Sequence, residues 1–330
     1  MTQTSSRRQF LASAAGLPLF QIRLRAAADK PMRGAFPIMS TPYNEAKEVD
    51  YEDLAKEVAF LDRCGAHGMV WPQFGSEYAA LTREERMRGM EVLAGAAKGK
   101  KPALILGVQD ESAEGAFDYA ERAEALAPDG MISMPPKDAT SIEDYRRYFH
   151  TMAKITRRPF FIQTSGGAKN VPPETGLLVE LAREFPNFGY IKAEFPPVLE
   201  RVRWLVANRP PIRSVMCGFN GRSFLYELRL GSDGTCPYAV CADVFAQIWD
   251  LHEAGKRAEA LRVYSKLLLI LNLQNVIPGT TEYLMKRRGV FKTVVSRQRE
   301  VKLSPDEIAE IEESYAELKP NLRAQTEWRE

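Results

Sequence analysis

One lysine stands in the middle of an otherwise apolar segment of this chain, "FPNFGYIKAEFPPV", residues 185–198. Burying a charged amine is costly, so lysine is rare inside buried strands. Two explanations are open: the segment is a solvated edge strand, or the protein requires an amine at Lys192. A desolvated amine is more readily neutral and nucleophilic, and such a lysine can form a Schiff base with a carbonyl substrate.

A carboxylate follows two residues after this lysine. Side chains alternate between the two faces of a strand, so Tyr190, Lys192 and Glu194 share one face, and Ile191 and Ala193 share the other. Glu194 has two interpretations that stay open here. It is either the counter-ion of Lys192 or a general acid or base that acts beside it.

These residues lie in the sixth of eight short apolar segments that recur along the chain. The segments span residues 34–40, 67–73, 103–109, 130–136, 160–165, 190–194, 214–219 and 234–239. Helical patterns separate them. One of these helical patterns ends at Gly65, and another begins with a capping box formed by Thr82 and Glu85. Eight alternating units predict an α/β fold, the closed (β/α)₈ TIM barrel. An open doubly wound sheet is the alternative, and the lack of a G-x-G-x-x-G turn after the first segment disfavours it.

The barrel decides how Lys192 is oriented. Helices cover the outside of such a barrel, so the apolar face of residues 190–194 points outward and Lys192 points inward, near the carboxyl ends of the strands where active sites lie. After about residue 258 the pattern is helical only. We therefore predict a barrel over residues 29–255 and a C-terminal helical extension over residues 256–330.

On these residues the chain resembles the dihydrodipicolinate synthase and N-acetylneuraminate lyase family of class I aldolases. The segment "STPYNE", with Thr41 and Tyr43, resembles the family's Thr-Pro-Phe segment. "QFGSEYAALTREER" resembles the glycine-rich segment after the second strand and keeps its glutamate, Glu77. Lys192 matches the family's strand-six lysine, and "GFNGR" and "GSDGTCP" resemble the ends of strands seven and eight.

The resemblance implies a Schiff-base lyase, an aldolase or a dehydratase, that acts on a 2-oxo acid such as one derived from a sugar. It implies no cofactor and a homodimer or homotetramer. In that reaction Lys192 attacks the ketone, and the protonated imine withdraws electrons from the bond that breaks. We assign catalysis to Lys192 and Glu194, and substrate binding to Thr41, Tyr43, Gly75, Ser76, Gln163, Thr164, Gly218, Asn220 and Arg222.

The sequence departs from the family where protons are moved. Gln163 stands at the position of the family's catalytic tyrosine, and Pro136 matches the tyrosine that relays protons from strand four. Of the hydroxyls that bind the substrate carboxylate, only Ser76 remains, because Gln73 and Phe74 replace the others. A glutamine side chain does not titrate, so the amine is present and the usual relay is absent.

Two other classes of function therefore stay open. The barrel could have lost catalysis and become a periplasmic binding protein for an oxo acid or a sugar. It could also be a metal-dependent lyase built on Glu77, Asp110 and Glu194. The three histidines and four cysteines show no short zinc-type spacing, so we predict no metal site.

The net charge and the N-terminal sequence indicate which partners the protein has and where it is located. A formal net charge of +2 on 330 residues excludes the strong basic field of a nucleic-acid-binding protein. Arg7 and Arg8 precede Phe-Leu and a short apolar stretch, and Ala26-x-Ala28 suits cleavage. We predict a twin-arginine-type signal peptide over residues 1–28 and a periplasmic protein without a membrane span. A basic tail on a cytoplasmic protein is the alternative.

Overall fold

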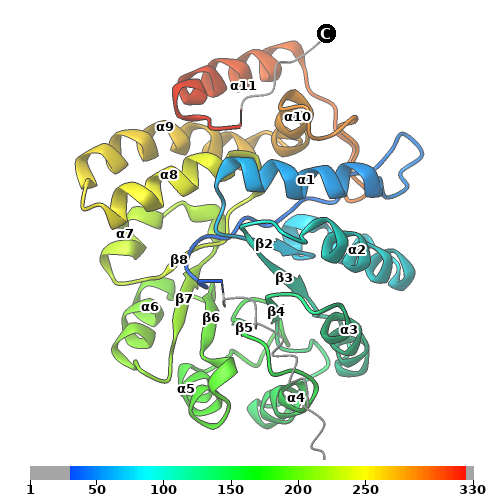
Figure 1. The fold of residues 1–330 in the computed structure, drawn as a ribbon, viewed down its shortest axis with the longest axis vertical. Coiled ribbons are helices and arrows are strands. Elements are labelled where there is room, and N and C mark those ends of the chain that lie inside the picture. The colour runs from blue at the N-terminus through cyan, green and yellow to red at the C-terminus, as the bar shows by residue number, and fades with distance from the viewer. Residues whose placement is uncertain (1–29, 325–330) are drawn as a thin grey trace, which may run out of the picture.

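The computed structural model describes residues 30–324, in which eight parallel strands lie inside a ring of helices (Figure 1). The strands are β1 (Gly34–Ala35), β2 (Gly68–Trp71), β3 (Ala103–Gly107), β4 (Gly130–Ser133), β5 (Phe160–Gln163), β6 (Tyr190–Ala193), β7 (Ser214–Cys217) and β8 (Gly234–Thr235). The order in the sheet is β1-β8-β7-β6-β5-β4-β3-β2. A parallel bridge between Ile38 and Val70 joins the two ends of the sheet, so the predicted TIM barrel is confirmed.

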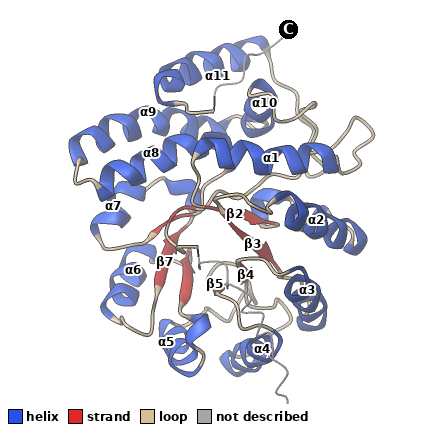
Figure 2. Cartoon of the chain, in the orientation of Figure 1, coloured by secondary structure: helices blue, strands red, loops and turns tan. Residues whose placement is uncertain are grey.

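One helix follows each strand and covers the outside of the barrel, as Figure 2 shows in blue around red. These helices are α1 (Tyr51–Cys64), α2 (Arg83–Ala96), α3 (Ala113–Leu126), α4 (Ile142–Ile155), α5 (Thr175–Glu184), α6 (Val198–Ala207), α7 (Phe224–Arg229) and α8 (Ala242–Glu253). The predicted helix ends are confirmed. Thr82 and Glu85 form the capping box of α2, and Gly65 ends α1 with a φ of 75° that favours glycine.

Apolar side chains form two layers on the two faces of the strands. The inner layer fills the barrel with Phe36, Ile38, Val70, Ala103, Ile105, Ile132, Phe161, Met216 and Cys236. The larger outer layer lies between strands and helices and includes Ile191 and Ala193 of β6, which are both fully buried. The two outward residues flank Lys192 in the sequence, so the predicted inward orientation of the lysine agrees with the packing.

Three further helices, α9 (Arg257–Val276), α10 (Thr280–Arg287) and α11 (Pro305–Leu318), form the C-terminal extension at the top of Figure 1. Helix α9 packs along α8, and α11 packs on α9. The loop after α10 then returns to the barrel, where the Thr293 hydroxyl donates a hydrogen bond to the Tyr43 carbonyl at 2.5 Å. Because α9 packs directly on α8, a domain division at residue 255 stays a prediction.

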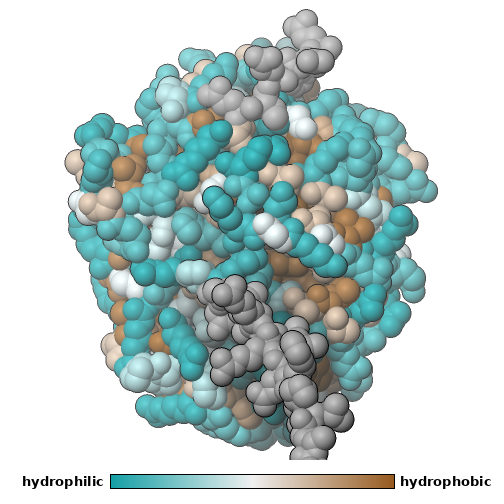
Figure 3. Space-filling view, in the orientation of Figure 1, coloured by the Kyte–Doolittle hydropathy of each residue, from teal (hydrophilic) through white to brown (hydrophobic). Residues whose placement is uncertain are grey.

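The predicted signal peptide, residues 1–28, lies outside the described residues. Within residues 30–324, no helix combines the length and the apolar character that crossing a membrane requires. On the coloured part of the face in Figure 3, hydrophilic residues predominate and apolar residues are scattered among them.

Candidate active site

Strand register brings the predicted catalytic lysine next to the glutamine that replaces the family's tyrosine. Gln163 of β5 and Lys192 of β6 are direct partners across the parallel pair. Lys192 is only 2% exposed. Its Nζ donates to Gln163 Oε1 at 3.3 Å and lies 3.1 Å from Glu194 Oε1. A buried amine therefore has one carboxylate and one amide oxygen as its partners.

A serine that follows β5 completes a ring of hydrogen bonds around the amine. The Gln163 amide donates to Ser165 Oγ at 2.7 Å, and Ser165 Oγ donates to Glu194 Oε2 at 2.5 Å. One oxygen of Glu194 thus faces Lys192 and the other accepts from Ser165. The carboxylate is held in one orientation, in which it can take a proton from the lysine.

Two residues that follow the neighbouring strands β5 and β7 hold Glu194 in this place. A Cβ atom on Gly218 of the neighbouring loop would lie 1.8 Å from Glu194 Oε1, so only glycine leaves room for the carboxylate. Thr164 Oγ1 accepts hydrogen bonds from the backbone N–H groups of Glu194 and Phe195 at 2.8 and 3.0 Å. Gly218 and Thr164 were predicted to bind substrate. In the structure they position the turn after β6.

A cavity of about 510 Å³ opens above the amine, which is within the usual size range of ligand sites. Of the predicted residues, Gly75, Lys192, Glu194, Asn220 and Arg222 line it. The remaining lining residues, which sequence reasoning missed, are Ile38, Phe74, Ser165, Phe219, Cys236, Tyr238, Gln274 and Asn275. Two of them, Phe74 and Phe219, are 50% and 53% exposed.

The other predicted binding residues do not reach this cavity. Gln163 and Thr164 are buried below its lining. Ser76 Oγ donates to the Met39 carbonyl at 2.5 Å, so the one retained hydroxyl of the glycine-rich segment is used within the protein. Tyr43 is also buried, and this burial raises the pKa of its phenol well above the ordinary value.

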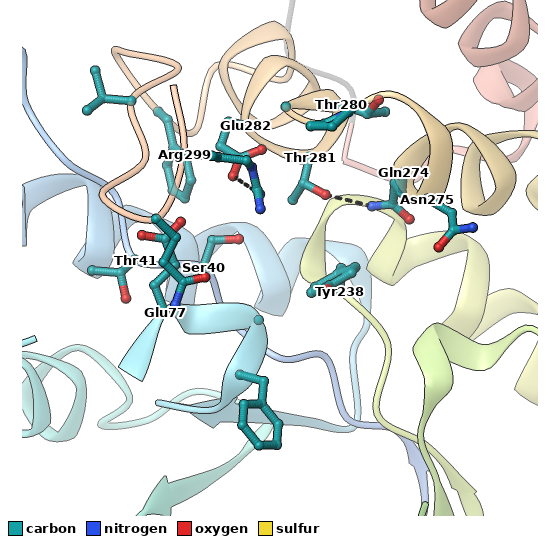
Figure 4. Close-up of a pocket in the computed structure, with 17 residues that line it drawn as sticks. Ser40, Thr41, Glu77, Tyr238, Gln274, Asn275, Thr280, Thr281, Glu282 and Arg299 are labelled. Carbon is teal, nitrogen blue, oxygen red and sulfur yellow. Dashed lines mark hydrogen bonds and ion pairs between the residues drawn. The ribbon is translucent and has the colours of Figure 1, made fainter. Parts of the chain in front are cut away.

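A second cavity, of about 260 Å³, adjoins the first and is shown in Figure 4. Thr41, a predicted binding residue, lines this one. The two cavities share the lining residues Phe74, Gly75, Tyr238, Gln274 and Asn275. Arg299 and Glu282 form an ion pair at 2.5 Å in its wall. The barrel mouth therefore extends toward the C-terminal helices.

A chain of hydrogen bonds ties the barrel mouth to those helices. The Asn220 side chain accepts from the backbone N–H of Tyr238 at 2.9 Å and donates to Gln274 Oε1 at 2.7 Å. Gln274 in turn donates to Thr281 Oγ1 at 2.9 Å. No periodicity in the sequence indicates that the end of α9 borders the site, because the contact spans more than fifty residues of chain.

Glu77 has a structural role in this arrangement. Its carboxylate accepts a hydrogen bond from Ser296 Oγ at 2.5 Å and one from the backbone N–H of Arg297 at 3.0 Å. Asp110 lies 3.5 Å from Arg86 as an ion pair. Within the part of the chain that the structure describes, no three acidic, histidine or cysteine side chains group closely enough to hold a metal ion. The alternative centre of Glu77, Asp110 and Glu194 is therefore not formed.

Comparisons with known proteins agree with this geometry. Residues 31–317 match the model of the dihydrodipicolinate synthetase family. The chain is 25% identical over 289 residues to L-2-keto-3-deoxyarabonate dehydratase of Azospirillum brasilense, covering 84% of this chain and 92% of the relative. It is 26% identical over 272 residues to 4-hydroxy-tetrahydrodipicolinate synthase of Chlorobaculum parvum, covering 80% and 90%.

Solved structures show the same fold. The crystal structure of dihydrodipicolinate synthase from Aquifex aeolicus superposes with a TM-score of 0.78 at 20% identity, over 88% of this chain and 99% of the other. The family match covers most of the chain and includes both the strand-six lysine and the barrel that surrounds it. The chain therefore belongs to the dihydrodipicolinate synthetase family.

Proposed function

We propose that this protein is a Schiff-base-forming lyase, an aldolase or dehydratase, that acts on a 2-oxo acid. The observation that carries the proposal is the buried Lys192 amine, 3.1 Å from a carboxylate, in the lining of a cavity of about 510 Å³. Structural lysines pair with carboxylates too, but they do not need an open cavity above the amine. Family membership supports the same chemistry.

The reaction begins when Glu194 takes a proton from the Lys192 ammonium group. The neutral amine then attacks the substrate ketone, and loss of water leaves a protonated imine. The imine draws electrons from the bond that breaks, so the substrate loses either a carbonyl fragment or water. Hydrolysis of the imine returns the free amine. Because Gln163 does not titrate, Glu194 is our candidate for the proton transfers at the imine.

The cavity also supports a hydroxylated substrate longer than pyruvate. Its lining includes the Arg222 guanidinium, which suits a carboxylate, and the amides of Asn220, Gln274 and Asn275. The second cavity continues beyond these amides. A relative named as L-2-keto-3-deoxyarabonate dehydratase is 25% identical to this chain, and we infer a 2-oxo acid derived from a sugar.

Trapping with borohydride tests the proposal. The protein is incubated with pyruvate and with 2-oxo-3-deoxypentonates, reduced, digested and analysed by mass spectrometry. We expect the reduced substrate mass on the peptide that holds Lys192. Lys192→Ala should abolish label and turnover, whereas Lys169→Ala, which removes an exposed lysine after β5, should change neither.

The second candidate function is a binding protein, which the replacement of both relay tyrosines by Gln163 and Pro136 favours. An inert binder could still form an imine, so label on Lys192 without any turnover of the panel would support this alternative. Label on other lysines only, or full activity of Lys192→Ala, would reject the Schiff-base mechanism.

We also propose export by the twin-arginine route to the periplasm, on the pattern of residues 1–28. Assembly as a homodimer or homotetramer stays a prediction from the family.

A further inference from the structure

A dehydration of this kind has two proton transfers, and a second acid–base group besides Glu194 can serve one of them. The carbon next to the imine loses a proton, and the hydroxyl on the following carbon must gain one to leave as water. One carboxylate oxygen of Glu194 pairs with Lys192, and the other accepts a hydrogen bond from Ser165. The carboxylate can accept the first proton, and a separate acid in the lining can protonate the leaving hydroxyl without waiting for that proton to be passed on.

Most other polar groups in the lining of the Lys192 cavity cannot supply that proton. The Ser165 hydroxyl already donates to Glu194. The Arg222 guanidinium already donates to the Leu271 carbonyl at 3.2 Å. The Cys236 thiol packs in the apolar inner layer of the barrel, and side-chain amides do not titrate. Tyr238 is the remaining acid in this lining.

The Tyr238 ring is held at the junction of the two cavities. It is the third residue after the end of β8, and its backbone N–H donates a hydrogen bond to Asn220 Oδ1. A Cβ atom on Gly75 would lie 2.3 Å from Tyr238 Cε1, so the ring packs directly against the glycine backbone. The ring is only half-buried, and its hydroxyl makes no hydrogen bond to any other described residue. A fixed phenol with an unused proton thus lines the space that holds the reacting amine.

We propose that Tyr238 is the general acid that protonates the leaving hydroxyl, which makes the reaction at Lys192 a dehydration; this rests on the lyase function proposed above. In the step, Glu194 accepts the proton from the carbon beside the imine, and the enamine forms. The enamine electrons then expel the oxygen on the next carbon. The C–O bond breaks, the Tyr238 O–H proton passes to that oxygen to form water, and solvent reprotonates the phenolate.

The charge environment keeps the phenol in its protonated form. Burial, and to a smaller extent the charges of Glu282 and Glu194, raise the pKa of the Tyr238 phenol above its ordinary value, while Arg299 and Lys192 act in the opposite direction. The hydroxyl therefore stays protonated at neutral pH, as an acid must. Because a neutral phenol holds its proton, it suits a departing hydroxyl better than it suits removal of a proton in aldol cleavage.

Tyr238→Phe is the direct test, because it keeps the ring on Gly75 and removes the hydroxyl. With a 2-oxo-3-deoxypentonate as the probe, we expect kcat to fall by about 10²-fold, at the lower end of general-acid effects. Borohydride labelling of Lys192 should persist, which shows that the site is intact. Tyr226→Phe is the matched control, since that hydroxyl is bonded to Arg203 outside the cavity and its loss should leave kcat unchanged.

A 4-fluoro-2-oxo acid separates proton donation from a structural effect, because fluoride leaves without needing a proton. We expect Tyr238→Phe to eliminate fluoride at close to the wild-type rate. Equal slowing of both substrates, or a kcat within twofold of wild type on the hydroxyl substrate, overturns the role of Tyr238. If the wild-type protein itself forms no imine, the lyase assignment fails, and this role fails with it.

Discussion

Gly218→Ala tests whether catalysis depends on the position of one carboxylate. The substitution adds a single methyl group between β7 and the mouth of the barrel. That carbon would lie 1.8 Å from Glu194 Oε1, 2.3 Å from its Cδ and 2.4 Å from its Cγ. The three clashes involve only the Glu194 side chain, and Lys192 is not among the nearest atoms. The amine should therefore keep its place while its partner is displaced.

The size of the effect follows from the distances. Non-bonded heavy atoms essentially never approach a Cβ within 3.0 Å, so Glu194 Oε1 must move away from its 1.8 Å position by about 1 Å or more. Displacing a catalytic group by about 1 Å can lower the reaction rate by about 10²-fold. The complete loss of acid–base help costs roughly 10² to 10⁴-fold. We expect Gly218→Ala to lower kcat by about 10²-fold.

The assay is steady-state turnover of a 2-oxo acid that labels Lys192, with borohydride trapping measured in parallel. Glu194→Gln is the comparator and should lower kcat at least about tenfold while trapping persists. The double variant should be little worse than Glu194→Gln alone, since both changes act on the same group. Gly176→Ala, where an added Cβ has no atom within 4 Å, is the control. A kcat for Gly218→Ala within twofold of wild type would refute this reasoning.

Two further predictions concern the substrate and the location of the protein. We expect no measurable condensation of pyruvate with aspartate semialdehyde, because Gln163 cannot relay a proton and Gln73 and Phe74 lack the usual hydroxyls; formation of dihydrodipicolinate in a coupled assay would contradict this. Replacing Arg7 and Arg8 together by lysine should leave unprocessed protein in the cytoplasm, as fractionation and immunoblotting would show, and equal amounts of processed periplasmic protein in both forms would reject twin-arginine export.

The fold and the inward orientation of Lys192 could be predicted from the sequence because both leave a local signature. Strands and helices differ in the period of their apolar residues, and eight repeats of the same unit admit few architectures. The same period of two places Lys192 opposite Ile191 and Ala193, which the outer core confirms. Glu194 follows from the same alternation, and the ion pair at 3.1 Å agrees with it.

Which residues line the cavity depends on the tertiary structure and could not be predicted from the sequence. Thr164 and Ser76 have the polar groups of binding residues, yet their hydroxyls hold backbone groups of the protein itself. Tyr238 and Gln274 border the cavity because β8 and the end of α9 meet above the barrel. Periodicity reports which face of an element is buried, whereas the partner of a polar atom depends on loops whose contacts span much of the chain. Glu77 and Ser296, bonded across 219 positions, show why that pairing cannot be read from either segment alone.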